Sequence, residues 1–304
     1  MYILLAICCA ICFGIGNSMQ KHGMAVTFPT ISASRFFREM PSIVKTLLSN
    51  WVWLLGLGFL IAGFIFQGKS MDAPGSKLSV IMPLLNISTV VTSLIGVFVL
   101  REQVKATEWL GIAALTLGAV MISCFDTGSA SRVFDTVLLD VSYLAGIASM
   151  GALLAGFGMG RSRRRGEVFL AIGSGLGFGM AAVALKMFDL DVKSTIGGFH
   201  VSDPRFFLTL LTSPNGWMFI VFNLAGFALF QLSFAHGRIF LIGPLSQVFA
   251  MVIPVVAGIA AFHESLVAWQ WAGVVVVTAS TFFVGSGQAP RVTEAGSEKG
   301  KTPS

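Results

Sequence analysis

Residues 83–111 read PLLNISTVVTSLIGVFVLREQVKATEWLG, and residues 244–273 read PLSQVFAMVIPVVAGIAAFHESLVAWQWAG. Both stretches place a proline in an apolar run, a glutamate 19 or 20 residues later, and then a Trp-x-Gly motif. The matched residues lie 161 or 162 positions apart, as Pro83 and Pro244, and Glu102 and Glu264, illustrate. A repeat at this separation predicts two related halves.

Further matches extend the repeat towards the start of each half. Phe66-Gln67 returns as Phe230-Gln231, and Phe13-Gly14 with Lys21 returns as Phe178-Gly179 with Lys186. Each half contributes four spans, and a fifth span joins the two halves. Each helix of the first half therefore lies five spans before its match in the second half. Because five is odd, the matched helices are expected to cross the membrane in opposite directions. Inverted repeats of this kind are typical of secondary transporters, whose halves rock about a central site.

Composition places the chain in a membrane. Of its 304 residues, 55% are hydrophobic and 11% are charged, and the mean hydropathy is +0.83. A soluble domain carries about 25% charged residues, so a water-soluble globule is excluded. We therefore expect an all-α integral membrane protein with about nine transmembrane helices in two inverted repeats.

A spanning helix needs roughly 20 apolar residues, and nine stretches meet this requirement: 2–20, 51–69, 77–100, 107–125, 136–160, 167–188, 216–236, 239–262 and 267–287. The expected divisions are a first repeat at 1–125, a linking span within 126–166, a second repeat at 167–287 and a disordered cytoplasmic tail at 288–304.

Basic residues predict the orientation. With the N-terminus outside, the inner connections carry fourteen Lys and Arg residues and the outer ones five, which the positive-inside rule favours. The expected location is the inner (cytoplasmic) membrane, with the C-terminus in the cytoplasm. Residues 33–48 fit an interfacial helix, because their charges make spanning costly. A tenth span within 24–49 is the alternative, and it would reverse the N-terminus.

The Pro, Glu and Trp-x-Gly pattern resembles the drug/metabolite transporter superfamily and its EamA-like permeases, over 51–123 and 217–285. The stretch Gly16-Asn17-Ser18-Met19-Gln20-Lys21-His22-Gly23 resembles the end of the first span in NIPA-type magnesium transporters. The resemblance implies transport of small solutes or, in the NIPA branch, of divalent cations. The acidic residues lie near span ends or in loops, whereas the small multidrug pumps of the superfamily carry a carboxylate within the membrane.

Polar residues within the spans are the candidates for binding substrate. In the third span Asn86, Thr89 and Ser93 share one helical face, and Gln247 follows Pro244 as Asn86 follows Pro83. The prolines remove backbone donors, which predicts broken helices beside a cavity. The remaining candidates are Asn17, Gln20, Asn223 and Gln231. Gln67 lies near the outer end of its span, where a gate or packing role is an equal alternative to binding. The alternative for all of them is hydrogen bonding between helices.

Charged residues near the span ends are candidates for gating or charge pairing: Lys21, Lys186, Glu102 and Glu264. The alternatives are lysines that snorkel to the interface and glutamates that mark the start of the following helix, where they suit its dipole.

The function that these features favour is secondary active transport of a small solute, a metabolite or drug-like compound, by alternating access. Alternatives are a magnesium or divalent cation transporter and a lipid or polyprenyl carrier. The chain lacks His-Glu-x-x-His, Gly-x-Ser-x-Gly and phosphate-loop motifs, so we expect no catalytic residues. We also expect no cofactor, no metal site and no nucleic-acid partner. The expected partners are the solute, membrane lipids and a coupling proton, with the chain as a monomer or homodimer.

Overall fold

The computed structural model describes residues 1–27, 45–98, 106–124, 135–159, 163–236 and 239–286. This part of the chain is helical and has no strand, which confirms the expected all-α fold for it. The helices are α1 (Tyr2–Thr27), α3 (Trp51–Asp72), α4 (Leu78–Leu85), α5 (Ile87–Phe98), α6 (Ala106–Cys124), α7 (Thr136–Met159), α8 (Arg163–Ile196), α9 (Pro204–Thr212), α10 (Pro214–His236), α11 (Ile239–Ala260) and α12 (Ala268–Ser286).

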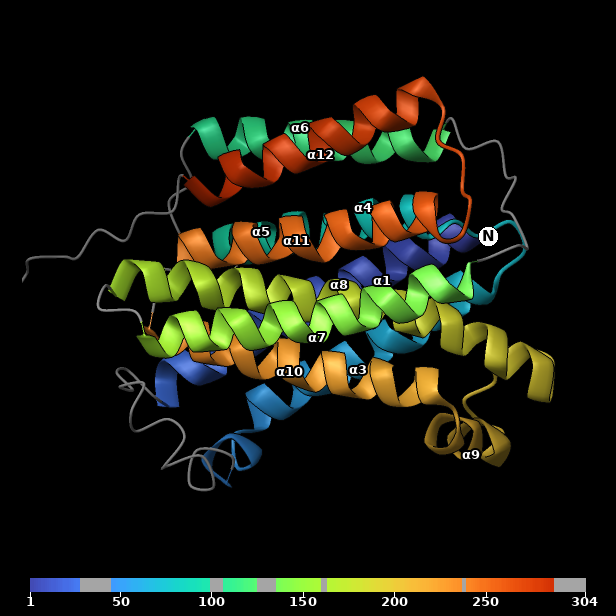
Figure 1. Ribbon diagram of the computed structural model, residues 1–304. Helices are drawn as coiled ribbons and strands as arrows, with labels where there is room; N and C mark the ends of the chain where they lie inside the picture. The colour runs from blue at the N-terminus through green and yellow to red at the C-terminus, as the bar shows by residue number, and fades with distance from the viewer. Residues whose placement is uncertain (28–44, 99–105, 125–134, 160–162, 237–238, 287–304) are drawn as a thin grey trace, which may run out of the picture.

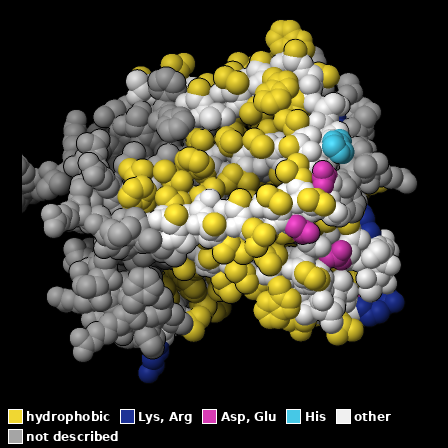
Figure 2. Space-filling view, viewed as in Figure 1, with side chains coloured by type: hydrophobic (Ala, Val, Ile, Leu, Met, Phe, Trp, Pro, Cys, Tyr) yellow, Lys and Arg dark blue, Asp and Glu magenta, His cyan; other side chains and the backbone are white. Residues whose placement is uncertain are grey.

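The outside of the bundle is apolar. Large hydrophobic side chains that are more than half exposed occur on several helices, among them Leu117, Leu144, Leu224, Val256 and Val275. In Figure 2 hydrophobic side chains cover the middle of the visible face, and the acidic side chains gather towards its right-hand end. This surface suits lipid rather than water.

Among the described residues, four helices are long and apolar enough to cross a membrane, and α9 with α10, bent by 83°, would make a fifth. The chain is thus a multi-pass α-helical membrane protein. Each of the nine expected spans contains a helix, and their number stays a prediction.

The third expected span is two helices that meet at Asn86. Pro83 has no backbone N–H, and the Asn86 N–H donates to the Pro83 carbonyl at 3.1 Å, a tighter i to i−3 turn that ends α4. The expected matching break in the second half is absent, because α11 runs from Ile239 to Ala260 through both of its prolines. The two halves differ at this point.

Two further differences concern the segment after the linking span. Helix α8 continues to Ile196, past the expected end at residue 188, and α9 was not expected. Asp203 caps α9 by accepting a hydrogen bond from the Arg205 N–H at 2.9 Å. Most of the expected interfacial helix at 33–48 and the whole of the expected tail at 288–304 lie outside the described residues.

The helices pack in two similar groups, in which α1 lies against α3, α4 and α5, and α8 lies against α10 and α11 (Figure 1). A Cβ atom at Gly14 would lie 2.8 Å from the Ser88 carbonyl oxygen, and one at Gly179 would lie 3.1 Å from the Phe249 carbonyl oxygen. These contacts join residues that the sequence repeat matches, so both groups use small residues to bring helices close.

Helices α6 and α12 form a separate antiparallel pair at one side of the bundle (Figure 1). Gly118 of α6 lies against Val277 of α12. Four residues later on α6, Ile122 lies against Gly273, which is four residues earlier on α12. Residue numbers therefore rise in opposite directions, and the matched Trp-x-Gly motifs lie at opposite ends of the pair.

The contact between α1 and α3 predicts a packing defect. A Cβ atom at Gly56 would lie 2.8 Å from the Gly16 carbonyl oxygen, whereas one at Gly58 would meet nothing within 4 Å. Gly56→Ala should destabilise the protein by about 1–3 kcal/mol relative to Gly58→Ala, measured as a lower Tm in detergent. Equal Tm values for the two variants would contradict this helix contact.

Candidate substrate site

A cavity of about 330 Å³ lies in the middle of the bundle, between α1, α3, α4, α5, α8, α10 and α11. Much of its lining is apolar, including Phe13, Leu60, Phe64, Met82, Phe178, Phe219, Phe227 and Met251. Five side-chain amides complete it: Asn17, Gln67, Asn86, Asn223 and Gln247. Small-molecule sites are typically apolar pockets of about 300–1,000 Å³ with a few polar groups, and this cavity fits that description.

The local structure of each helix places the amides. Asn86 is the C-terminal cap of α4, three residues after Pro83, and the residue is 2% exposed. Gln247 lies on α11 three residues after Pro244. Asn17 lies on α1 one turn after Phe13, so both face the same cavity.

Three of the amides are open to a ligand. Within the described residues, the side chains of Asn17, Asn86 and Gln247 form no hydrogen bond with the protein. The Asn223 amide, in contrast, donates to the Phe219 carbonyl at 3.0 Å. Asn86 is buried, and Asn17 and Gln247 are half-buried, so all three amides could donate hydrogen bonds to a ligand in the cavity and accept them from it.

Two of the other expected site residues, Gln20 and Thr89, do not line the cavity. Gln20 is buried beside Gly56 at the contact of α1 with α3. Thr89 lies in the first turn of α5 and is not among the lining residues, although its neighbour Ser88 is. The side chains of Ser93 and Gln231 lie outside the described part of the chain.

The sequence analysis missed two serines in the lining and left Gln67 between a binding role and a gate or packing role. Ser88 and Ser246 both line the cavity, and Ser246 Oγ accepts a hydrogen bond from Ser174 Oγ at 2.8 Å. Gln67 lines it as well, and its amide donates to Met82 Sδ at 3.7 Å. A signal was available, because Ser246 directly precedes Gln247 within the repeated motif.

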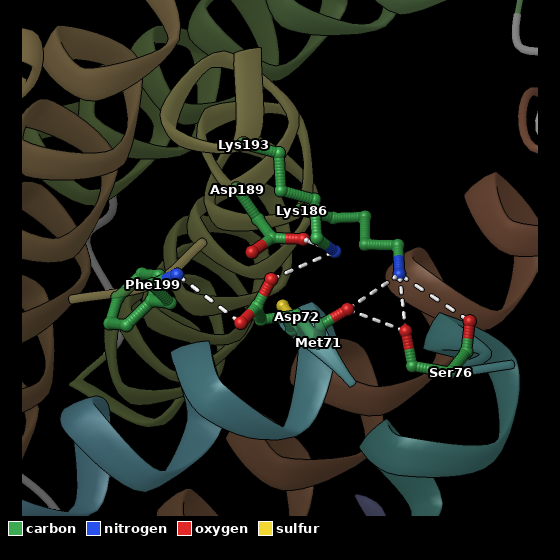
Figure 3. Close-up of polar contacts among 7 residues, drawn as sticks. All are labelled: Met71, Asp72, Ser76, Lys186, Asp189, Lys193 and Phe199. Carbon is green, nitrogen blue, oxygen red and sulfur yellow. Dashed lines mark hydrogen bonds and ion pairs between the residues drawn. The ribbon is translucent and has the colours of Figure 1, made fainter. Parts of the chain in front are cut away.

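Lys186 holds one end of the bundle together, where α3 ends and α4 begins (Figure 3). Its Nζ atom donates to Ser76 Oγ at 2.8 Å, to the Met71 carbonyl oxygen at 3.2 Å and to the Ser76 carbonyl oxygen at 3.4 Å. The residue is 9% exposed, so snorkelling does not describe it. A side chain of the second half therefore binds the loop between two helices of the first.

Beside Lys186, a charged cluster links the same elements (Figure 3). Lys193 on α8 pairs with Asp72 at the end of α3 at 3.2 Å and with Asp189 at 2.8 Å. Asp72 also accepts a hydrogen bond from the Phe199 N–H at 3.2 Å. The Asp189 side chain is fully buried, so this cluster is part of the packed end rather than a solvated surface.

Glu264 binds the N-terminus of α4. Its Oε1 atom accepts from the Leu78 N–H at 2.7 Å, and Oε2 accepts from the Ser79 N–H at 2.8 Å and the Ser79 hydroxyl at 2.6 Å. The carboxylate thus satisfies free donors of α4 and suits its dipole. His263, in the turn before it, has a left-handed backbone with φ of 50°.

This arrangement changes one expectation about the charged residues. Glu264 was expected to pair with a lysine or to mark the start of the span that follows it, but its carboxylate binds a helix of the other half. The side chain of Lys21 and the whole of Glu102 lie outside the described residues, so their proposed gating roles remain predictions.

Removing the Glu264 carboxylate should weaken this end of the bundle. Glu264→Ala leaves buried donors of α4 unpaired and should lower stability by about 1–3 kcal/mol, seen as a lower Tm. Glu264→Gln keeps one acceptor oxygen and should have a smaller effect. A wild-type Tm for Glu264→Ala would show that the carboxylate does not hold α4.

Comparison with known proteins gives several related sequences. No protein-family model and no solved structure matches the chain. A probable magnesium transporter, NIPA9 of Arabidopsis thaliana, is 24% identical over 267 residues, which are 83% of this chain and 70% of the plant protein. A probable 4-amino-4-deoxy-L-arabinose-phosphoundecaprenol flippase subunit, ArnE of Pseudomonas savastanoi pv. phaseolicola, is 30% identical over 125 residues, 40% of this chain and 93% of that one. The ArnE of Proteus mirabilis is 44% identical over 72 residues, 23% of this chain and 62% of its own length.

Proposed function

The chain belongs to the drug/metabolite transporter superfamily, and from this premise we propose that it is a secondary active transporter of a small, uncharged or amphipathic organic solute. The observation that carries the proposal is the central cavity, in which three side-chain amides, one buried and two half-buried, have no hydrogen-bond partner among the described residues. Neutral amides both donate and accept hydrogen bonds, so they suit a solute with hydroxyl, amide or similar groups.

The proposed mechanism is alternating access between two inverted halves. Two structural features support it: the matched contacts of Gly14 and Gly179, and the antiparallel pairing of α6 with α12. The Pseudomonas savastanoi ArnE adds a third, because 93% of its length matches only 40% of this chain. The cavity lies between helices of both proposed halves, so a rocking motion of one half against the other would change its access.

Contacts between the halves at one end of the bundle would act as the gate. Lys186 and Glu264, both in the second half, bind the loop and the helix start that follow α3 in the first half. Opening this end requires these hydrogen bonds to break. With the N-terminus outside and about nine spans, as the basic residues predict, this closed end would face the outside.

The lining of the cavity bears on the two alternative cargoes. The described lining residues are all uncharged, whereas magnesium is usually bound through one or two carboxylates. This favours an organic solute over the magnesium named for the plant relative. A lipid-linked sugar, as named for the flippase subunits, combines an apolar part with hydrogen-bonding groups, which agrees with the mixed lining.

The amides of Asn86 and Gln247 provide the test. Asn86→Ala and Gln247→Ala should each lower transport, and the double variant should lower it by at least about tenfold, because each change removes a hydrogen bond to the solute. The measurement is a screen of labelled solutes in proteoliposomes, with and without an imposed proton gradient.

Thr89→Ala is the matched control, because Thr89 lies near Asn86 but outside the cavity lining. Normal transport by the double variant would remove this site assignment. Growth rescue of a bacterial strain that lacks its own magnesium uptake systems would favour the cation alternative instead.

A further inference from the structure

The central cavity is open at its side. Ile61 on α3 and Leu224 on α10 both line it, yet they are 54% and 65% exposed. A lining residue with that exposure lies at the mouth of a cavity rather than inside a closed one. The mouth is therefore between α3 and α10, two helices that meet at the rings of Phe64 and Phe219 and whose ribbons are both drawn in the lower part of Figure 1.

The surroundings of this mouth are apolar. Leu57 and Leu60 on α3 and Phe227 on α10 line the cavity beside it, and it lies in the middle of two apolar helices rather than at their ends. Because α3 is long and apolar enough to span a membrane, a mouth halfway along it meets lipid chains, not water. An opening here gives access from the hydrocarbon layer.

An aromatic contact closes the mouth on the side of the Lys186 contacts. The Phe64 ring on α3 and the Phe219 ring on α10 meet edge to face, with centroids 6.0 Å apart, and Phe64 also packs against Phe13 at 5.1 Å. The open part of the mouth thus begins at Ile61 and Leu224. It leads directly to the cavity that holds the unpaired amides.

We propose that the substrate is an amphiphile, whose polar head binds the amides of Asn17, Asn86 and Gln247 while its alkyl or isoprenoid chain passes between Ile61 and Leu224 into the lipid. This inference rests on the proposed function, because it names the substrate class of the same cavity. The cavity, at about 330 Å³, is at the small end of ligand pockets. It takes a head group but not a long chain, and leaving the chain in lipid avoids the cost of exposing it to water.

Two photoreactive glucosides with the same sugar head test the inference on the full chain in lipid nanodiscs. One carries a diazirine on a decyl chain and the other a diazirine on a methyl-length group. The decyl probe should bind at least about tenfold more tightly, because its chain stays in an apolar environment. Its cross-links, mapped by mass spectrometry, should fall on α3 and α10 beside the mouth.

Filling the mouth should affect the two probes differently. Ile61→Trp with Leu224→Trp should abolish the advantage of the decyl probe, so that the two probes bind with similar affinity. A wild-type Tm in detergent shows that this variant is folded. Leu55→Trp with Val221→Trp is the matched control, because both residues are exposed on the same helices but do not line the cavity. This control pair should leave both probes unchanged.

Three results would overturn the inference: equal affinity of the two probes, cross-links of the decyl probe spread over the lipid-facing helices, or labelling of the cavity by neither probe. The double variant Asn86→Ala with Gln247→Ala distinguishes failure of the lateral mouth from failure of the proposed amide site. If that variant binds both probes normally while the tryptophan pair still removes the decyl advantage, the amide site is wrong and the lateral mouth is right.

Discussion

Polar groups inside an apolar bundle must find partners, because lipid supplies none, and this constraint organises the structure. At one end, Glu264 satisfies the start of α4 and Lys186 satisfies the loop before it. In the centre, the amides of Asn17, Asn86 and Gln247 have no partner among the described residues. The first set joins the two parts of the chain, and the second set forms the site that we propose for the solute.

Helix α4 links the hydrogen-bonded end of the bundle to the central cavity. Its first residues bind the Glu264 carboxylate, and its last residue is capped by Asn86 at the edge of the cavity. The helix is only eight residues long, so a movement that releases its start also reaches the cavity. The contacts of Lys186 on α8 and of Glu264 after α11 would thus couple the closed end to the proposed binding site.

The sequence predicted the amides of the cavity better than the helical face around them. Asn86, Gln247, Asn17 and Asn223 were found because they are amides within apolar spans, and all four line the cavity. Thr89 was expected to share a helical face with Asn86, but α4 ends just before Asn86, and Thr89 of α5 does not line the cavity. Gln20 belongs to a span as well, yet it packs against Gly56 of α3, a contact that depends on the neighbouring helix.

The sequence by itself determined the environment and the helical class, because apolar runs of this length and so few charges are stable only in lipid. It also indicated the repeat, since matched motifs keep their separation along the chain. Only the tertiary structure decided which polar groups are paired, where Glu264 binds, and that the cavity opens sideways between α3 and α10. These features depend on contacts between residues that are far apart in the chain. The spacing of residues along one helix does not predict such contacts.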